Sequence, residues 1–134
     1  MSDTITFELV SPEGIIFSKE VEMVVLPGSE GDFSVLKDHA LFVSSLRSGG
    51  IEVFEDKEVI SDRVFVADGF AEIKENICTA LVSESILISN IDVEECKQKI
   101  QDAENSLTAS DENKKVEINK KIGLYKAMID AKNS

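Results

Sequence analysis

Residues 26–40 read LPGSEGDFSVLKDHA and contain the most marked turn signal in the chain. Pro27 restricts its own backbone, while the two glycines of the GSEG segment can adopt positive φ without steric cost. Glu30 and Asp32 give the turn an acidic tip. Apolar residues lie on both sides, which indicates a polar loop between two buried strands. Loops of this kind, held on a rigid scaffold, often carry binding residues.

Short apolar runs with frequent turns continue from this loop in both directions, up to about residue 88. Residues 4–10 alternate apolar with polar side chains, and in 20–26 Glu20 and Glu22 alternate with Val21, Met23 and Val25, which is the period of a half-buried strand. Turns are expected where charged residues or glycine interrupt the runs, at 55–58, 68–69 and 75–76. Many short strands without an intervening helix favour an antiparallel β-sandwich or a flattened barrel. All seven phenylalanines lie between residues 7 and 70, so an aromatic core is expected in this part.

The hydrophobic period changes at about residue 90. Asp92 and Glu95 form a start similar to a capping box, in which the aspartate accepts from free N–H groups of the first helical turn. Apolar residues then recur at spacings of three and four, which predicts two helices separated by a polar break at 108–111. The first stripe is Val93, Cys96, Ile100, Ala103 and Leu107, and the second is Ile118, Ile122, Tyr125 and Ile129. Two stripes joined by a short polar turn predict an antiparallel helical hairpin.

The predicted fold class is therefore α+β, with an N-terminal antiparallel β-sandwich over residues 3–88 and a C-terminal antiparallel two-helix hairpin over residues 91–132. Each helix has only a narrow apolar stripe, and isolated helices of this length are marginal in water. The hairpin is thus expected to pack on the sandwich, on a partner, or on each at different times.

The chain is acidic, with a net charge of −12 over 134 residues. Residues 1–91 hold 17 acidic and 6 basic side chains, so the excess lies in the predicted sandwich. This argues against nucleic acid or anionic lipid as a partner, because phosphate binding needs clustered lysine and arginine. No apolar run is long enough to cross a membrane, and the start lacks the pattern of an export signal. We therefore expect no membrane insertion, no export and a preference for basic partners.

Catalytic and metal-binding patterns are missing from the sequence. His39 is the only histidine, and no serine stands in the G-x-S-x-G context of a nucleophile. Gly49 and Gly50 lack the lysine of a phosphate-binding loop. Cys78 and Cys96 lack the C-x-x-C pairing of a zinc or redox site and are expected to be buried thiols in a reducing compartment. No catalytic residue, metal or cofactor is predicted, which leaves a binding module or a structural coupling subunit.

Four segments decide between these two classes: SPEG at 11–14, the loop at 26–40, LRSGGIEVF at 46–54 and VADGFAEI at 66–73. Together with the pair Ile91-Asp92, they resemble the epsilon subunit of the bacterial F-type ATP synthase, called delta in mitochondria, over essentially the whole chain. The resemblance implies a non-catalytic rotor subunit in the central stalk of a proton-translocating enzyme. Such a subunit couples rotation of the c ring to ATP synthesis through the gamma subunit. It implies a peripheral protein at the cytoplasmic face of the bacterial inner membrane.

The resemblance also suggests roles for single residues. Glu30 and Asp32 match the family's acidic loop, which contacts the c ring, and basic loops of the ring would suit these carboxylates. Ser11 and His39 match positions that face gamma or the ring in relatives. For His39 the alternative is a residue that merely closes a strand connection.

The predicted hairpin departs from one family pattern. Some relatives bind ATP through I/L-D-x-x-R-A, in which the aspartate and the arginine hold the nucleotide. Here Asp92 is present, but Glu95 stands in place of the arginine and would repel a triphosphate. We therefore expect no nucleotide site and assign Asp92 as a helix cap.

The resemblance further implies that the hairpin folds down on the sandwich or extends upward, where it can block ATP hydrolysis. Six lysines are concentrated in the predicted second helix: Lys114, Lys115, Lys120, Lys121, Lys126 and Lys132. They are either a solvated face or a surface that meets an acidic segment of the catalytic beta subunit, and both alternatives stay open here.

Overall fold

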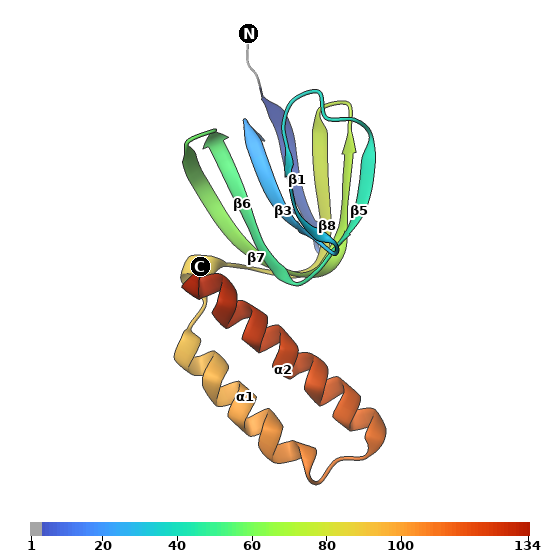
Figure 1. Cartoon of the computed structure of the whole chain (residues 1–134), viewed down its shortest axis with the longest axis vertical. Helices are drawn as coiled ribbons and strands as arrows, with labels where there is room; N and C mark the ends of the chain where they lie inside the picture. The colour runs from blue at the N-terminus through green and yellow to red at the C-terminus, as the bar shows by residue number, and fades with distance from the viewer. Residues whose placement is uncertain (1–3) are drawn as a thin grey trace. The chain divides into compact units, whose positions relative to one another are not determined.

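The computed structural model describes residues 4–134 and divides into two compact units, one ending at Leu87 and the other beginning at Ile88 (Figure 1). Residue 3, where the predicted sandwich begins, lies outside the described residues. The first unit contains eight strands and the second contains the two helices. The predicted fold class, a β-sandwich followed by a helical hairpin, is confirmed.

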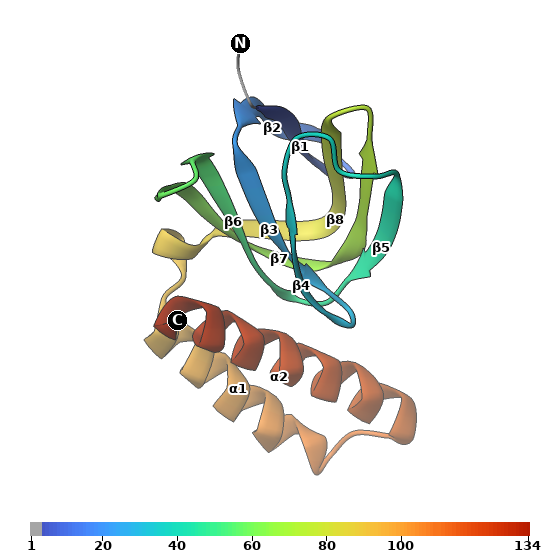
Figure 2. The same ribbon diagram turned by 45° about the horizontal axis from the view of Figure 1, so that its top comes forward.

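The strands of the first unit are short except for the last two. They are β1 (Ile5–Ser11), β2 (Gly14–Val21), β3 (Met23–Gly28), β4 (Gly31–Val35), β5 (Phe42–Leu46), β6 (Gly49–Asp56), β7 (Val59–Lys74) and β8 (Ile77–Leu87). They are hydrogen-bonded in the order β2-β1-β8-β7-β5-β3-β4, and β6 pairs with both β3 and β7. All pairs are antiparallel except β1 with β8. Because β7 pairs with β5, β6 and β8, the strands wrap around one interior, as Figure 2 shows.

That interior is filled by the inward side chains of alternating strands. In β1, Ile5, Phe7 and Leu9 are buried while the residues between them are partly exposed, as the period of two requires. They pack in one cluster with valines, leucines and isoleucines from the other strands. No polar side chain is buried among residues 4–134. The apolar cluster therefore makes this unit a rigid body with its own core.

The strand predicted over 20–26 is divided at Glu22 between β2 and β3. Val21 still pairs with Ile5 of β1, whereas Met23 pairs with Phe54 of β6. The burial alternation shifts by one residue at this change of partner, because Val24 and Leu26 are buried in β3 while Met23 and Val25 are only half-buried. Alternation in the sequence alone therefore does not reveal the break.

The predicted turn at Asp68 and Gly69 is wrong, because β7 runs through both residues. Ala67 pairs with Glu84 and Gly69 pairs with Val82, so the register is the same on both sides of Asp68 and the strand continues through it. Asp68 has a φ of 36°. Aspartate and glycine both tolerate unusual backbone angles, so they suit a bend within a strand as well as a turn.

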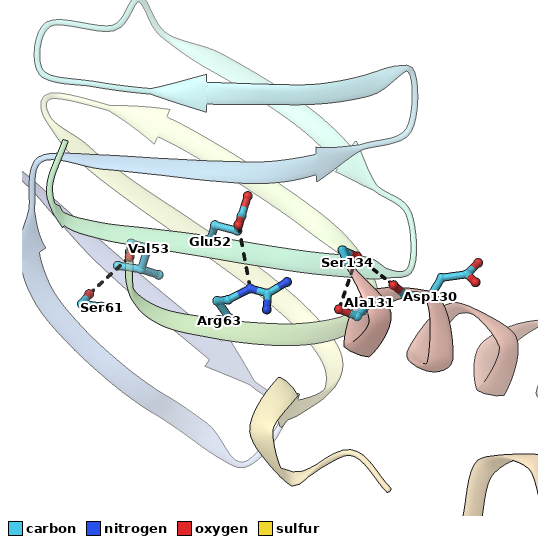
Figure 3. Close-up of polar contacts among 7 residues, drawn as sticks. All are labelled: Glu52, Val53, Ser61, Arg63, Asp130, Ala131 and Ser134. Carbon is cyan, nitrogen blue, oxygen red and sulfur yellow. Dashed lines mark hydrogen bonds and ion pairs between the residues drawn. The ribbon is translucent and has the colours of Figure 1, made fainter. Parts of the chain in front are cut away.

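Polar contacts within each unit are shown in Figure 3. Across the β6–β7 pair, Ser61 Oγ donates to the Val53 carbonyl at 3.3 Å, and Arg63 Nε lies 3.8 Å from Glu52 Oε2. In the second unit, Ser134 Oγ donates to the carbonyls of Asp130 and Ala131. These carbonyls belong to the last turn of a helix, where backbone acceptors lack helical partners.

The second unit consists of a short 3₁₀ turn (Ile88–Asn90), α1 (Val93–Leu107) and α2 (Glu112–Asn133). Asp92 caps α1 by accepting from the Glu95 amide at 3.2 Å, as predicted. Asp111 caps α2 in the same way through the Lys114 amide at 2.9 Å.

The two helices pack together along a narrow seam. Cys96, Ile122 and Ala131 are their buried residues. Other members of the predicted stripes, Ile100 and Ile118 among them, are only half-buried. Lys99 Nζ lies 5.6 Å from the centre of the Tyr125 ring, a cation–π contact that joins the two helices.

Candidate functional site

The acidic loop is a tight hairpin between β3 and β4. Pro27 pairs with Asp32 and Gly28 with Gly31, which leaves Ser29 and Glu30 as the two residues of the turn. Gly31 has a φ of 137°, and a Cβ on Gly28 would lie 2.6 Å from the Gly31 carbonyl oxygen. Both glycines are therefore required by the turn, as the sequence predicted. Ser29–Asp32, called the tip from here on, is exposed along its whole length.

Backbone hydrogen bonds fasten the base of the tip to the end of β5. The Ser29 amide donates to the Ser45 carbonyl at 3.0 Å, and the Arg47 amide donates to the Pro27 carbonyl at 2.9 Å. The hydroxyls of Ser29 and Ser45 lie 3.4 Å apart. The tip is thus presented by three strands, β3, β4 and β5, and its base is not a free loop.

The Arg47 side chain links both strands of the hairpin. Its Nη1 donates to the Gly28 carbonyl at 2.6 Å, and its Nη2 lies 2.5 Å from Asp32 Oδ1. Asp32 therefore has a role within the chain, as the ion-pair partner of Arg47. Within the described residues Glu30 makes no hydrogen bond or ion pair, so its carboxylate is the unpaired charge of the tip.

His39 lies in the connection between β4 and β5. Its Nδ1 is 2.8 Å from the Ala40 carbonyl oxygen, and because that oxygen can only accept, Nδ1 carries the proton. Its ring centre lies 5.9 Å from that of Phe42, which makes an edge contact with Phe33 of β4. His39 therefore packs in an aromatic cluster beside the strand that carries the tip.

The same connection is closed by a second contact. Asp38 adopts a φ of 65°, and its amide donates to Asn76 Oδ1 at 2.7 Å. Asn76 belongs to the β7–β8 turn. This agrees with the alternative in which the residues around His39 close a strand connection, and it leaves the ring partly exposed for a partner.

Ser11 lies at the β1–β2 turn, on a different hairpin from the tip. Its hydroxyl donates to Glu13 Oε2 at 3.0 Å and accepts from the Glu13 amide at 3.3 Å. These contacts stabilise the turn and leave Ser11 partly exposed.

A surface that sequence reasoning missed lies next to Ser11, on the outer face of the sheet. Ile15 pairs with Val10, Val10 with Leu81, and Leu81 with Phe70, so four outward apolar side chains run across β2, β1, β8 and β7. We call these four residues the apolar row. Phe70 is 59% exposed, Ile15 63% and Leu81 48%. Contiguous exposed apolar side chains of this kind mark interaction sites.

At the start of α1, Asp92 and Glu95 both have partners within the chain. Asp92 is engaged as the cap, and Glu95 Oε1 pairs with Lys99 Nζ at 2.9 Å. Among the lysines of α2, Lys132 Nζ donates to the carbonyls of Ile88 and Ser89. Lys120 and Lys121 are exposed.

The two cysteines are free and buried. Burial raises the pKa of the Cys78 thiol to about 12 and also raises that of Cys96, so both thiols are protonated at neutral pH and poor nucleophiles. In the part of the chain that the structure describes, no group of three metal-ligating side chains could hold an ion. Neither of the helices in residues 4–134 has the length and apolar character of a membrane span.

Comparison with known proteins agrees with this picture. The family model for the ATP synthase delta/epsilon chain, beta-sandwich domain, matches residues 4–106. The chain is 38% identical over 133 residues to the ATP synthase epsilon chain of Rhodospirillum rubrum, covering 98% of both chains. It is 40% identical over 129 residues to that of Maricaulis maris, covering 96% of both.

Two solved assemblies contain chains with a similar fold. A chain of the Euglena gracilis mitochondrial ATP synthase, in a structure that includes the c-ring, superposes with a TM-score of 0.84 at 20% identity over 98% of this chain and 82% of that one. A chain of the Tetrahymena thermophila mitochondrial ATP synthase central stalk and c-ring has a TM-score of 0.55 at 12% identity, over 63% of this chain and 67% of that one. These likenesses concern the fold, while the matches to the curated relatives carry the family. The chain therefore belongs to the family of ATP synthase epsilon chains, a non-catalytic subunit of that enzyme complex.

Proposed function

We propose that this chain is a central-stalk rotor subunit that couples rotation of the c ring to ATP synthesis through gamma in a proton-translocating ATP synthase. The observation that carries the proposal is the apolar row on the outside of a sandwich whose core is complete without it. A subunit that transmits torque must be rigid and firmly held. A packed β-core gives rigidity, and exposed apolar side chains across four strands give a face for permanent attachment.

Gamma is the partner proposed for the apolar row. Val10, a member of the row, is followed directly by Ser11, one of the residues that match interface positions in the family. The row combines an aromatic side chain, Phe70, with aliphatic neighbours, a composition common at the centre of stable interfaces. The proposed gamma contact therefore includes Ser11 and the apolar row.

The c ring is the partner proposed for the tip. Its Glu30 carboxylate is exposed and unpaired within the described residues, so it can meet a basic side chain without first breaking an internal contact. His39 is proposed to lie at the same interface or at that of gamma, since its aromatic cluster includes Phe33 of β4. The sandwich, residues 3–88, is then the part that binds gamma and the ring.

The hairpin, residues 91–132, is proposed as a regulatory part that limits ATP hydrolysis. Its buried seam is narrow and most of its basic residues are exposed, so it can change packing partners at small cost. Lys120 and Lys121 are proposed to meet an acidic segment of the catalytic beta subunit. As part of this complex, the chain is proposed to lie peripherally at the cytoplasmic face of the bacterial inner membrane, without a cofactor.

Co-purification with gamma tests the proposal. We expect the double variant Phe70→Ser and Leu81→Ser to lose gamma while its circular dichroism spectrum stays that of the parent chain, because both side chains are exposed and contribute little to folding. Val59→Ser is the matched control: Val59 is 56% exposed on the β6–β7 hairpin, outside the row. Retention of gamma by the folded double variant, or equal loss in the control, would reject the row as the gamma-binding face.

A further inference from the structure

The Arg47 side chain contacts the residue that precedes the tip and the last residue of the tip. Gly28 is the last residue of β3, and Asp32 lies in β4. One guanidinium donates to the carbonyl of the first through Nη1 and to the carboxylate of the second through Nη2. The planar guanidinium presents these donors in a fixed fork, whereas a lysine offers one compact charge. Arg47 therefore clamps the two strands at the point where the turn leaves them.

Because of this clamp, only one of the two carboxylates of the tip is paired within the chain. Asp32 is neutralised by a cation of its own chain, while Glu30 has no hydrogen bond or ion pair among residues 4–134. A basic partner that approached Asp32 would compete with Arg47, whereas one that approached Glu30 would meet an unpaired charge. The carboxylates are therefore unequal as ligands for a basic partner.

The clamp contributes little to the stability of the whole fold. The side chains of Arg47 and Asp32 are 47% and 60% exposed, and ion pairs this exposed have small effects on folding. What the clamp fixes is local, namely the direction in which the two turn residues point.

We propose that Arg47 is a positioning residue: it fixes the tip so that Glu30, and not Asp32, forms the ion pair with a basic side chain of the partner. The inference rests on the proposed contact between the tip and the c ring. It assigns Asp32 an internal role, as the anchor for Arg47.

Charge and position predict opposite results for Arg47→Ala. The substitution removes a positive charge and frees Asp32, so if total negative charge determined the attraction, affinity for a basic partner would rise. If position determines it, affinity falls, because Glu30 is no longer held in place. The sign of the change therefore separates the two accounts.

The experiment measures binding of each full-length variant to membranes that contain ATP synthase depleted of its epsilon subunit. We expect Glu30→Gln to weaken binding by about five-fold, the size of one solvent-accessible ion pair, and to reduce its dependence on salt. Arg47→Ala should weaken binding by a similar factor. Asp32→Asn should stay within about two-fold of the parent chain, because the amide oxygen can still accept from Arg47.

The double variant Glu30→Gln with Arg47→Ala completes a thermodynamic cycle. Once Glu30 is neutral, Arg47→Ala should have no further effect. Lys57→Ala is the matched control, because it removes one positive charge from an exposed position at the β6–β7 turn, and it should bind as the parent chain does.

Hydrogen exchange of the isolated variants provides a readout that does not depend on the partner. In Arg47→Ala the Ser29 amide, which donates to the Ser45 carbonyl, should exchange faster while amides of the core strands are unchanged. Unchanged protection of Ser29 would show that Arg47 does not hold the tip and would overturn the inference.

The remaining outcomes distinguish failure of the proposed ring contact from failure of the positioning role of Arg47. If Glu30→Gln binds like the parent chain, the proposed ring contact itself fails. If Glu30→Gln weakens binding but Asp32→Asn weakens it equally, or if the effect of Arg47→Ala persists in the Glu30→Gln background, the ring contact stands and the positioning role is rejected. Stronger binding by Arg47→Ala would likewise reject positioning in favour of total charge.

Discussion

Gly69 lies where β7 leaves no room for a side chain next to β8, and replacing it with alanine should destabilise the sandwich. A Cβ at this position would lie 2.1 Å from the Leu81 carbonyl oxygen and 3.0 Å from the Val82 Cα. Both neighbours are backbone, so neither can rotate away, and the two strands must move apart. Gly69 also pairs with Leu46 of β5, so the displacement strains a second strand pair. Overpacking of this kind costs roughly 1–3 kcal/mol, and we expect the upper part of that range.

The matched control is the same substitution in a position with free space. Gly123 lies within α2, and a Cβ added there would have no neighbouring atom within 4 Å. Because alanine favours the helix over glycine, Gly123→Ala should stabilise α2 by about 0.5–1 kcal/mol. The two glycine-to-alanine changes should therefore have opposite signs.

Urea unfolding followed by far-ultraviolet circular dichroism measures both effects, with hydrogen exchange to assign each to its unit. In Gly69→Ala the amides of β8 should lose protection, whereas in Gly123→Ala those of α2 should gain it. If Gly69→Ala unfolds within about 0.5 kcal/mol of the parent chain, the range typical of surface changes, then the close approach of β7 and β8 at Gly69 is wrong.

Three further predictions concern charge and the hairpin. Lys19 Nζ lies 2.6 Å from Asp62 Oδ2, and its hydrogen bond lowers the pKa of Asp62 in the folded chain. The pair therefore stabilises the fold at pH values above the usual carboxyl pKa of about 4. This stabilisation is lost as the pH falls. Asp62→Asn should reduce the free energy of unfolding by up to about 1 kcal/mol at neutral pH, because both groups are partly exposed. The reduction should be smaller at about pH 3 in the same urea titrations. An equal loss at both pH values would contradict this prediction. Ile100→Asp should speed proteolysis in the loop after α1 and leave the sandwich intact, because it places a charge on the seam between the helices. The control Gln101→Asp changes an exposed residue and should not speed cleavage. Equal cleavage of the two variants would argue against the seam. MgATP should not bind the isolated chain in calorimetric titration, because Glu95 repels the triphosphate, and a saturable isotherm tighter than about 1 mM, roughly −4.1 kcal/mol, would refute this.

The sequence predicts the fold well where side-chain period reflects burial. The alternation in β1 and the cap at Asp92 are local features, and the structure shows both of them. It predicts the fold poorly where the decisive fact is which strand pairs with which. Asp68 and Gly69 were expected to turn the chain, but these residue types also suit a bend within a strand, and only the pairing of Ala67 and Gly69 with β8 shows that the strand continues.

In the candidate site, too, the sequence does not reveal which distant residues come into contact. The acidic tip was recognisable from its own residues, but its partner Arg47 lies 15 positions from Asp32 in a segment with no periodic signal. The apolar row was missed for a different reason. In β7 and β8 the small residues Ala71 and Ala80 face the core while Phe70 and Leu81 face outward, which reverses the usual expectation that larger apolar side chains are buried.

That reversal is itself informative about function. Facing Phe70 inward would bury an aromatic side chain, a gain of about 1.5–3 kcal/mol, and the chain forgoes this gain at adjacent positions on two neighbouring strands. Their inward alanines pair directly with each other, so β7 and β8 meet the core with small side chains and the interior is still filled. The large side chains of Phe70 and Leu81 are therefore exposed although the core is completely packed without them. A partner that covers them would recover the burial that folding leaves unused, and this is the physical reason to place the stable attachment on the apolar row and the weaker, charge-dependent contact at the tip.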